Sequence, residues 1–211
     1  MHAHVLTLRM MVAAVSLLHA PCSAYRPGVP ETLTRNLYEF FPFPPTPVED
    51  TQHIAHAAIP RSGPWGPRMF VGPSHLPDIV SHVWGGTLPP DLPVRVLFAG
   101  GGTGASMILL LNQLRVANVP CEAVHFDLSN ASIELARQRA RIAGFTRTVT
   151  FLRGSLLDTV GAIQRLQALI RGQGFHYIDC VGVLMATADP SLALRNLASV
   201  SYTHLTLPTK A

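Results

Sequence analysis

The sequence predicts an α/β protein with a mostly parallel, doubly wound sheet of the Rossmann-like type. From residue 94 onward, apolar runs of strand length alternate with segments of helical periodicity. A glycine-rich turn follows the first apolar run, and an acidic residue ends the second. At 211 residues with 48% hydrophobic content, the chain is long enough to form one core of moderate size.

The apolar runs and their flanking residues set the expected boundaries. We expect strands at residues 94–99, 122–126, 149–152 and 177–183, and helices at residues 103–116, 130–143, 156–171 and from 190 onward. Gly144 and Gly172 stand where glycine commonly ends a helix, and Asp189 before Pro190 is typical of a helix start. Before the sheet, residues 77–84 are expected to form a short helix that ends at two glycines.

The first 93 residues differ in character from the α/β region. Residues 1–24 resemble a secretory signal or organelle-targeting peptide, and a disordered arm or a mis-set start codon are the alternatives. Without such a peptide, the protein would be cytoplasmic. The apolar stretch is too short for a stable membrane span. Residues 25–93 are dense in proline, which removes amide donors, so we expect an extended, loop-like extension. Its aromatic residues indicate that part of it wraps around the core.

The charge distribution argues only weakly for a nucleic-acid partner. Charged residues make up 13% of the chain, so the net charge of +4 reflects scarce acids rather than a dense basic surface. Four arginines cluster in or just after the second helix, namely Arg137, Arg139, Arg141 and Arg147. We interpret them as a solvated outer face, with a nucleic-acid surface as the weaker alternative.

Metal binding is not indicated either. The three cysteines lack metal-ligand spacing and are interpreted as buried thiols. Asp50, His53 and His56 are too loosely arranged in a proline-rich stretch to predict a metal site.

The residues that could bind a ligand follow the expected strands. The first strand runs into Gly100–Gly104, a turn whose bare backbone can pass close to a ligand. Asp127 ends the second strand, at the sheet edge where open α/β sheets bind ligands, and its carboxylate can accept both hydroxyls of a ribose. Capping of the next helix is the alternative role, but Ser129 and Asn130 are nearer the cap position. Ser155 and Leu156 follow the third strand.

In their order, these motifs resemble those of class I S-adenosylmethionine-dependent methyltransferases. Residues 96–104 (VLFAGGGTG) look like the first motif of that family, 126–129 (FDLS) like the second and 154–158 (GSLLD) like the third. Residues 175–184 (FHYIDCVGVL), with the later Asp189–Pro190, are similar to the fourth strand and its turn. The resemblance covers residues 76–200, and four ordered motifs are fairly specific.

This resemblance implies S-adenosylmethionine as cofactor and a methyl-acceptor substrate that the sequence does not identify. It implies a cofactor site made of Gly100, Gly101, Gly102, Gly104, Asp127, Leu128, Ser155, Leu156 and Gly182. In this site the glycine turn would pass under the methionine part and Asp127 would bind the ribose. Ser155 with Leu156 would flank the adenine, and Gly182 would lie near the methyl donor.

Two departures from the family pattern affect the expected chemistry. Phe98 stands where many members carry an acid that anchors the methionine end of the cofactor. Residues 185–187 lack the histidines often found there, so no catalytic residue is identified. Methyl transfer does not require a base in every case, because alignment of a reactive sulfonium with its acceptor supplies much of the catalysis.

The end of the chain is expected to be incomplete relative to this family. The seven-stranded methyltransferase sheet would continue beyond the fourth helix, so residues 94–200 would form a partial cofactor-binding domain with an exposed fourth strand. Residues 201–211 break the helical pattern and are interpreted as a non-native tail. Such a fragment could be inactive.

Two other functions stay open. Gly100, Gly102 and Ala105 also fit the GxGxxA pattern of NAD(P)- or FAD-binding oxidoreductases. A non-catalytic Rossmann-like binding module is the third interpretation, because Phe98 replaces the expected acid. Gly104 and Ser155 favour the methyl donor over a nicotinamide.

Overall fold

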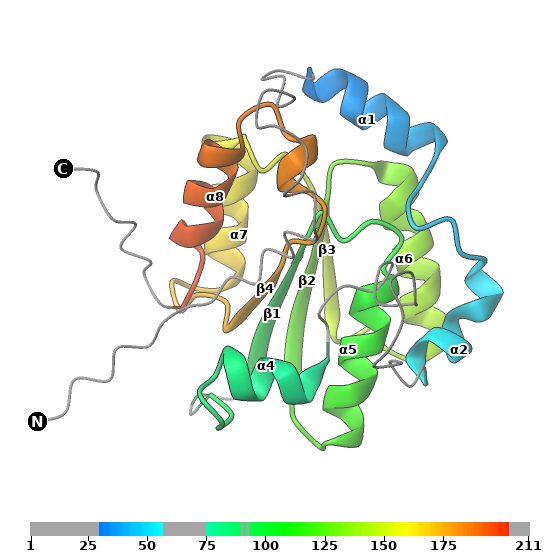
Figure 1. Ribbon diagram of the computed structural model, residues 1–211, viewed down its shortest axis with the longest axis vertical. Helices are drawn as coiled ribbons and strands as arrows, with labels where there is room; N and C mark the ends of the chain where they lie inside the picture. The colour runs from blue at the N-terminus through cyan, green and yellow to red at the C-terminus, as the bar shows by residue number, and fades with distance from the viewer. Residues whose placement is uncertain (1–29, 57–74, 90, 92, 203–211) are drawn as a thin grey trace, which may run out of the picture.

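A computed structural model describes residues 30–56, 75–89, 91 and 93–202 of the chain. Its centre is a parallel sheet of four strands in the order β3-β2-β1-β4, as Figure 1 shows. The strands are β1 (Val94–Ala99), β2 (Cys121–Asp127), β3 (Val149–Arg153) and β4 (Tyr177–Asp179). The α/β class and the parallel sheet predicted from the sequence are therefore confirmed.

Helices cover both faces of the sheet, which makes it doubly wound. Side chains of α4 (Leu76–His82), α5 (Ala105–Val116) and α6 (Asn130–Ala143) join one hydrophobic cluster. The other cluster includes side chains of η3 (Thr159–Ile163), α7 (Gln164–Leu169) and α8 (Pro190–Ser199). The sheet thus lies between two apolar layers.

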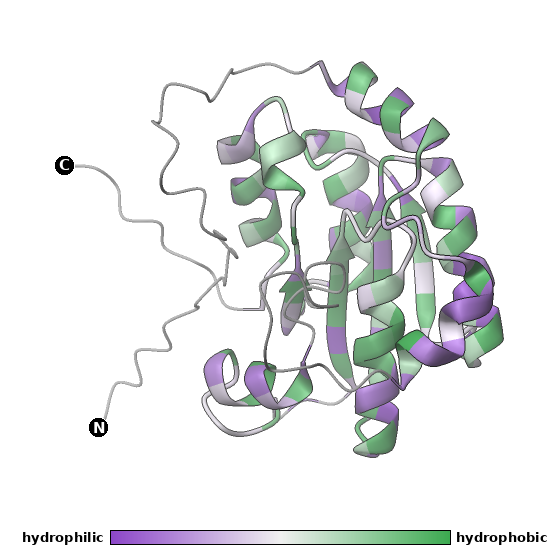
Figure 2. Cartoon of the chain, turned by 45° about the vertical axis from the view of Figure 1, so that its right-hand side comes forward, coloured by the Kyte–Doolittle hydropathy of each residue, from purple (hydrophilic) through white to green (hydrophobic). Residues whose placement is uncertain are grey.

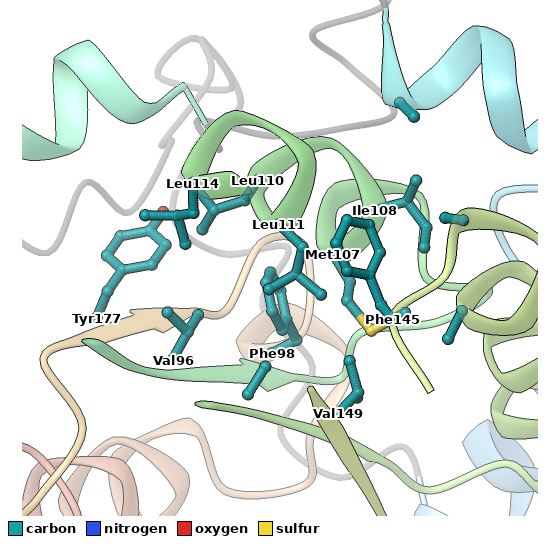
Figure 3. Packing of buried hydrophobic residues seen from close by; sticks show 14 of the residues in the cluster. Val96, Phe98, Met107, Ile108, Leu110, Leu111, Leu114, Phe145, Val149 and Tyr177 are labelled. Atoms are coloured by element: carbon teal, nitrogen blue, oxygen red, sulfur yellow. The ribbon is translucent and has the colours of Figure 1, made fainter. Parts of the chain in front are cut away.

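The central strand β1 contributes side chains to both apolar layers. Val94, Val96 and Phe98 pack in the cluster under α5, whereas Leu97 and Ala99 pack in the opposite one. Figure 3 shows Val96 and Phe98 below the α5 leucines. Because both faces are buried, β1 is apolar at nearly every position rather than alternating.

Several expected elements differ from the structure at their ends, and two of them, β4 and the helix expected at residues 156–171, differ most. β4 stops at Asp179 instead of residue 183, because the chain turns at Gly182, whose φ is +73°. The expected helix 156–171 begins only at Thr159. Asp158 accepts hydrogen bonds from the backbone of Gly161 and Ala162, so it serves as the cap instead of joining the helix.

The N-terminal extension is not purely extended, so that expectation is wrong. It contains α1 (Glu31–Phe40), η2 (Val48–Asp50) and α2 (Thr51–Ala55). Residues 31–41 carry no proline, which leaves room for a helix between Pro30 and Pro42. The extension does wrap around the core, as expected: α2 packs against α5 and α6, and Asn112 of α5 donates to the carbonyl of Ala55. Figure 2 shows hydrophilic and hydrophobic residues alternating along α1.

The ends of the chain lie mostly outside the described residues. This holds for the expected targeting segment 1–24 and for residues 203–211 of the expected tail. Of that tail, Ser201 is buried and bridges to Phe175, and the Tyr202 backbone donates to the Phe175 carbonyl. In the part of the chain that the structure describes, we find no helix with the length and apolar character that a membrane crossing requires.

Candidate functional site

The candidate site is a cavity at the carboxyl ends of the strands. Seven of the nine residues proposed from the sequence line it: Gly100, Gly102, Asp127, Leu128, Ser155, Leu156 and Gly182. The strand order places the segments after β3, β2, β1 and β4 side by side along one edge. Residues far apart in the sequence therefore meet there.

Two glycines of the turn after β1, Gly100 and Gly102, line the cavity. Gly100 has a φ of +66°, and a side chain there would collide with Val183. Gly101 and Gly104 are not among the lining residues. A side chain at Gly101 would collide with the His125 imidazole, and one at Gly104 would collide with Ala136 of α6. These two glycines thus permit close packing inside the protein.

At Gly102 the absence of a side chain makes room for another segment of the protein. A side chain there would strike the carbonyl oxygen of Phe43 in the N-terminal extension. The same carbonyl accepts a hydrogen bond from the Thr103 backbone at 3.0 Å, and the Thr103 hydroxyl donates to the Pro44 carbonyl at 2.9 Å. The extension therefore crosses the glycine turn where the sequence pattern suggested only a ligand.

Asp127 lies at the centre of the edge and is 7% exposed. Its two carboxylate oxygens accept from the backbone N–H groups of Gly102 and Ser129, each at 2.8 Å. Burial raises the pKa of Asp127, and these hydrogen bonds act against that shift. A carboxylate can accept about four hydrogen bonds, so acceptor capacity remains for a ligand in the cavity.

The cap of α6 is Ser129, as the sequence indicated. The Ser129 hydroxyl accepts from the Ser132 backbone at 3.1 Å. Asp127 is therefore not needed as the cap of this helix. The Ser129 hydroxyl in turn donates to the Tyr38 carbonyl of α1 at 3.0 Å.

On the β3 side, Ser155 is already engaged. Its hydroxyl donates to the carboxylate of Glu31 in α1 and accepts from the Leu157 backbone at 2.9 Å. Leu156 is buried in the cluster below the edge and lines the cavity as an apolar surface. On the β4 side, nothing lies within 4 Å of where a side chain of Gly182 would begin, so this position faces open space.

Helix α1 is the part of the site that the sequence motifs missed. It contributes Glu31, Thr34 and Tyr38 to the cavity lining. The Thr34 hydroxyl donates to the Ala186 carbonyl in η4 (Leu184–Ala186) at 3.1 Å, while Glu31 reaches the β3 side. Figure 1 shows α1 running across the upper edge of the molecule, above the sheet. The helix forms a roof over the edge.

Glu39 fixes the other end of this roof. Its carboxylate accepts from the backbone of Asn130 and Ala131, each at 2.9 Å, at the start of α6. The hydrogen bond from Asn130 is the main reason that the pKa of Glu39 is lowered. A carboxylate at a helix N-terminus is also favoured by the helix dipole.

The interpretation of the arginine cluster as a solvated face is wrong for Arg139, which is fully buried. Its guanidinium donates to the carbonyls of Thr103, Pro47 and Thr46 at 2.9, 3.1 and 2.6 Å. It therefore joins the glycine turn to the N-terminal extension. Arg137 lies over the Phe151 ring, at 4.6 Å from its centre.

His125 supports the glycine turn from behind. Its Nε2 lies 3.1 Å from the Gly102 carbonyl, and its Nδ1 has no hydrogen-bond partner among the described residues. Complete burial lowers the pKa of His125 to about 4. The ring is therefore neutral near pH 7 and donates its Nε2 proton to the turn.

The side chains that line the cavity include few groups that could act as an acid, a base or a nucleophile. Its described carboxylates are those of Glu31 and Asp127, and the described lining contains no histidine, cysteine or lysine. Phe98 lies fully buried in the cluster under α5, so the expected methionine-anchoring acid is replaced by a core residue. Cys121 and Cys180 are only partly buried, and desolvation raises the pKa of each to about 12.

Comparison with known proteins gives the following likenesses. No family model matches the chain. An uncharacterized protein from Synechococcus is 30% identical over 175 residues, which is 82% of this chain but only 35% of that protein. The chain thus spans about a third of the length of this relative.

Among solved structures, the [4+2]-cyclase SpnF matches with a TM-score of 0.51 and 19% identity, over 83% of this chain and 57% of that one. Magnesium protoporphyrin IX methyltransferase from Synechocystis, crystallised with bound SAH, matches with a TM-score of 0.47 and 18% identity, over 82% of this chain and 68% of that one. With the parallel β3-β2-β1-β4 sheet and its two helical layers, the described chain has the class I, Rossmann-like methyltransferase fold.

Proposed function

We propose that this protein binds S-adenosylmethionine in the cavity and transfers its methyl group to an acceptor molecule. The observation that carries the proposal is the meeting of Asp127, the glycine turn and Gly182 along one sheet edge. Asp127 would accept the ribose hydroxyls, because its buried carboxylate is held from behind by backbone N–H groups. The adenine would lie on Leu156, and the sulfur would lie toward Gly182.

The fit of the cofactor is better at the nucleoside end than at the methionine end. Asp127 and Leu156 offer a carboxylate and an apolar surface to the nucleoside. At the other end, Phe98 belongs to the core, and the backbone N–H groups of residues 100–104 already donate within the protein, so the glycine turn offers the methionine carboxylate no free donor. When bound, the cofactor supplies an electrophilic methyl group, and the chain orients it and excludes water beneath α1.

The proposal is tested first by calorimetric titration with S-adenosylmethionine, S-adenosylhomocysteine and NADH. We expect both adenosyl-sulfur ligands to bind and NADH to bind at least about 100-fold more weakly, a difference of about 2.7 kcal/mol. Tight binding of NADH alone would instead support an oxidoreductase.

A pair of glycine variants tests where the ligand lies. Gly182 and Gly86 both have positive φ, and neither would meet a neighbour within 4 Å if it carried a side chain. Ala at either position therefore costs a similar backbone strain of about 1 kcal/mol. Only Gly182→Ala adds a methyl group to the cavity, so it should weaken S-adenosylhomocysteine binding while Gly86→Ala should not. Equal affinities in the two variants would remove Gly182 from the site.

A second candidate is a cofactor-binding protein that does not transfer a methyl group. It is favoured by the likeness to a [4+2]-cyclase and by the absence of histidine, cysteine and lysine from the described lining. Incubation with S-adenosylmethionine and an extract of small molecules, with S-adenosylhomocysteine formation as the readout, separates the candidates. Binding without turnover across such extracts would favour the second.

A further inference from the structure

We infer that the carboxylate of Glu31, on the roof helix α1, recognises the exocyclic amino group of the adenine ring. The inference rests on the proposed function, since it assumes an adenosyl ligand in the cavity. It assigns to the N-terminal extension a specificity-determining residue that lies outside the motifs of the sheet.

Ser155 is largely committed to contacts within the protein. Its only O–H donates to Glu31, and its oxygen accepts from the Leu157 backbone at 2.9 Å, which leaves one acceptor site. The Glu31 carboxylate to which Ser155 is bonded carries a charge and more free acceptor sites. It is therefore the stronger acceptor on the β3 side of the cavity.

Glu31 has acceptor sites to spare. One oxygen is bound by Ser155, and the other accepts from Arg35 at 3.2 Å. These two bonds leave about half of the acceptor sites of a carboxylate unused. The Glu31 side chain is 29% exposed and lines the cavity, so the free sites can meet a ligand. Such a group suits a donor, and the adenine amino group is a donor with two protons.

Glu31 is tied to the β3 side of the cavity. Ser155, to which it is bonded, follows β3, whereas Gly182 follows β4 at the opposite edge of the sheet. Three strand spacings separate these two strands, about 14 Å. If Asp127, after β2, holds the ribose and the sulfur lies toward Gly182, the base of the nucleoside lies on the side of Glu31.

The test compares S-adenosylhomocysteine with S-inosylhomocysteine, in which a carbonyl oxygen replaces the amino group. A carboxylate accepts from the amino group but repels the carbonyl oxygen, so the wild-type protein should prefer the adenine ligand by about 10- to 100-fold. Glu31→Gln can donate to that oxygen through its amide, so the preference should fall by about tenfold or more. Because the readout is a ratio of two affinities in one protein, a general weakening of binding does not alter it.

Two further variants sharpen the result. Glu49→Gln makes the same acid-to-amide change at an exposed residue of the extension outside the cavity lining, and it should keep the wild-type preference. Ser155→Ala frees the Glu31 carboxylate and should also keep the preference. Loss of the preference in Ser155→Ala would overturn the inference, because Ser155 would then be the residue that recognises the adenine. A Glu31→Gln variant whose ratio of the two affinities stays within twofold of wild type would overturn it as well.

The outcome also separates this inference from the proposed function. If the wild-type protein binds neither ligand, the adenosyl site itself is wrong and the inference falls with it. If the protein binds both ligands equally well, the adenosyl site stands and the role of Glu31 is rejected. A folded Glu31→Gln variant is verified by its melting temperature. Should that variant unfold, the preference of Ser155→Ala decides between Glu31 and Ser155.

Discussion

The two ends of the sheet both bury charged side chains, but they satisfy those charges in different ways. At the amino end, Arg95 donates to Asp91 at 2.8 Å and to the Gly174 carbonyl at 2.7 Å. His176 lies 3.0 Å from the same Asp91, and its ring packs on Tyr202 with 4.8 Å between centres. Opposite charges therefore meet there directly, and Arg95 is the main reason that the pKa of Asp91 is lowered.

At the carboxyl end, charges are held mainly by neutral groups. Asp127 accepts from two backbone N–H groups, and Arg139 donates mainly to carbonyls and to Thr hydroxyls. A carboxylate held in this way keeps its charge and some of its acceptor sites. At the amino end the charged groups therefore satisfy one another, whereas at the carboxyl end Asp127 keeps acceptor sites that we propose a polar ligand uses.

The largest expected effect is that of Arg139→Met. The change leaves the buried Thr103 carbonyl and the half-buried Thr46 carbonyl without their Arg139 donor and removes one donor from the Pro47 carbonyl, so the free energy of unfolding should fall by about 3–5 kcal/mol. Urea unfolding measures it. Arg141→Met, at a side chain that is 60% exposed, is the matched control and should change stability by less than about 0.5 kcal/mol. Similar losses in both variants would show that Arg139 does not link the extension to the glycine turn.

The next effect is a pH dependence caused by His125. Its pKa is about 4 in the folded protein and near its usual 6.5 in the unfolded chain, so protonation favours unfolding. This contribution to stability is complete above pH 6.5 and is lost as the pH falls toward 4, by about 3 kcal/mol in total. Asp127, whose pKa is raised, opposes this trend.

The comparison with His125→Gln isolates the His125 contribution, because Asp127 is present in both proteins. The Gln amide can still donate to the Gly102 carbonyl but does not titrate in this range. We expect urea unfolding at pH 4.5 and 7 to show a smaller loss of stability in the variant than in wild type. Parallel pH profiles would mean that His125 is not the group that titrates.

Arg95→Met tests the amino end in isolation. It removes the cation that faces Asp91 and His176, so the free energy of unfolding should fall by about 2–3 kcal/mol. The affinity for S-adenosylhomocysteine should stay within twofold of wild type, because the cavity is at the other end of the sheet. A large loss of affinity would break the distinction between the two ends.

The smallest effect in free energy, but the most specific, is that of Asp127→Ala. It should weaken S-adenosylhomocysteine binding by about 1–3 kcal/mol, because a charged partner of the ribose is lost. Binding to the wild type should also weaken as the pH falls through the raised pKa of Asp127, since the protonated acid accepts fewer hydrogen bonds. Calorimetry at several pH values measures both changes. An unchanged affinity in the variant would remove Asp127 from the ligand site.

The sheet could be predicted from the sequence because its signals are local. Five of the six residues of β1 are apolar, with Arg95 as the exception, and α6 has an N-terminal Ser cap and Gly144 at its end. The strand-end motifs followed from the same signals, since parallel strands bring their carboxyl ends to one edge. β4 was predicted too long, because hydropathy does not reveal that Gly182 turns the chain.

The roof over the site could not be predicted in this way. Contacts of α1 join residues that are far apart in the chain, such as Glu31 with Ser155 and Thr34 with Ala186. Its apolar residues Leu33, Leu37 and Phe40 are exposed. Glu31, Thr34 and Tyr38 line the cavity instead, so the hydrophobic period of α1 does not mark the face that meets the protein.

Arg139 carried a signal that was available in the sequence. It lies three residues after Ala136 and next to Ala140, so helical spacing places it on the buried stripe of α6. Arg137 and Arg141 are two residues away on either side and fall on the opposite face. Proximity in the sequence placed these three in one cluster with Arg147, whereas the helical period separates Arg139 from Arg137 and Arg141.

We propose that an adenosyl ligand lies along the carboxyl edge with its ribose on Asp127, and a crystal structure of the protein with S-adenosylhomocysteine would show this arrangement or exclude it. We expect both ribose hydroxyls on the Asp127 carboxylate, the adenine over Leu156 and the sulfur near Gly182. A ligand bound elsewhere, or one with its ribose away from Asp127, would rule the proposal out.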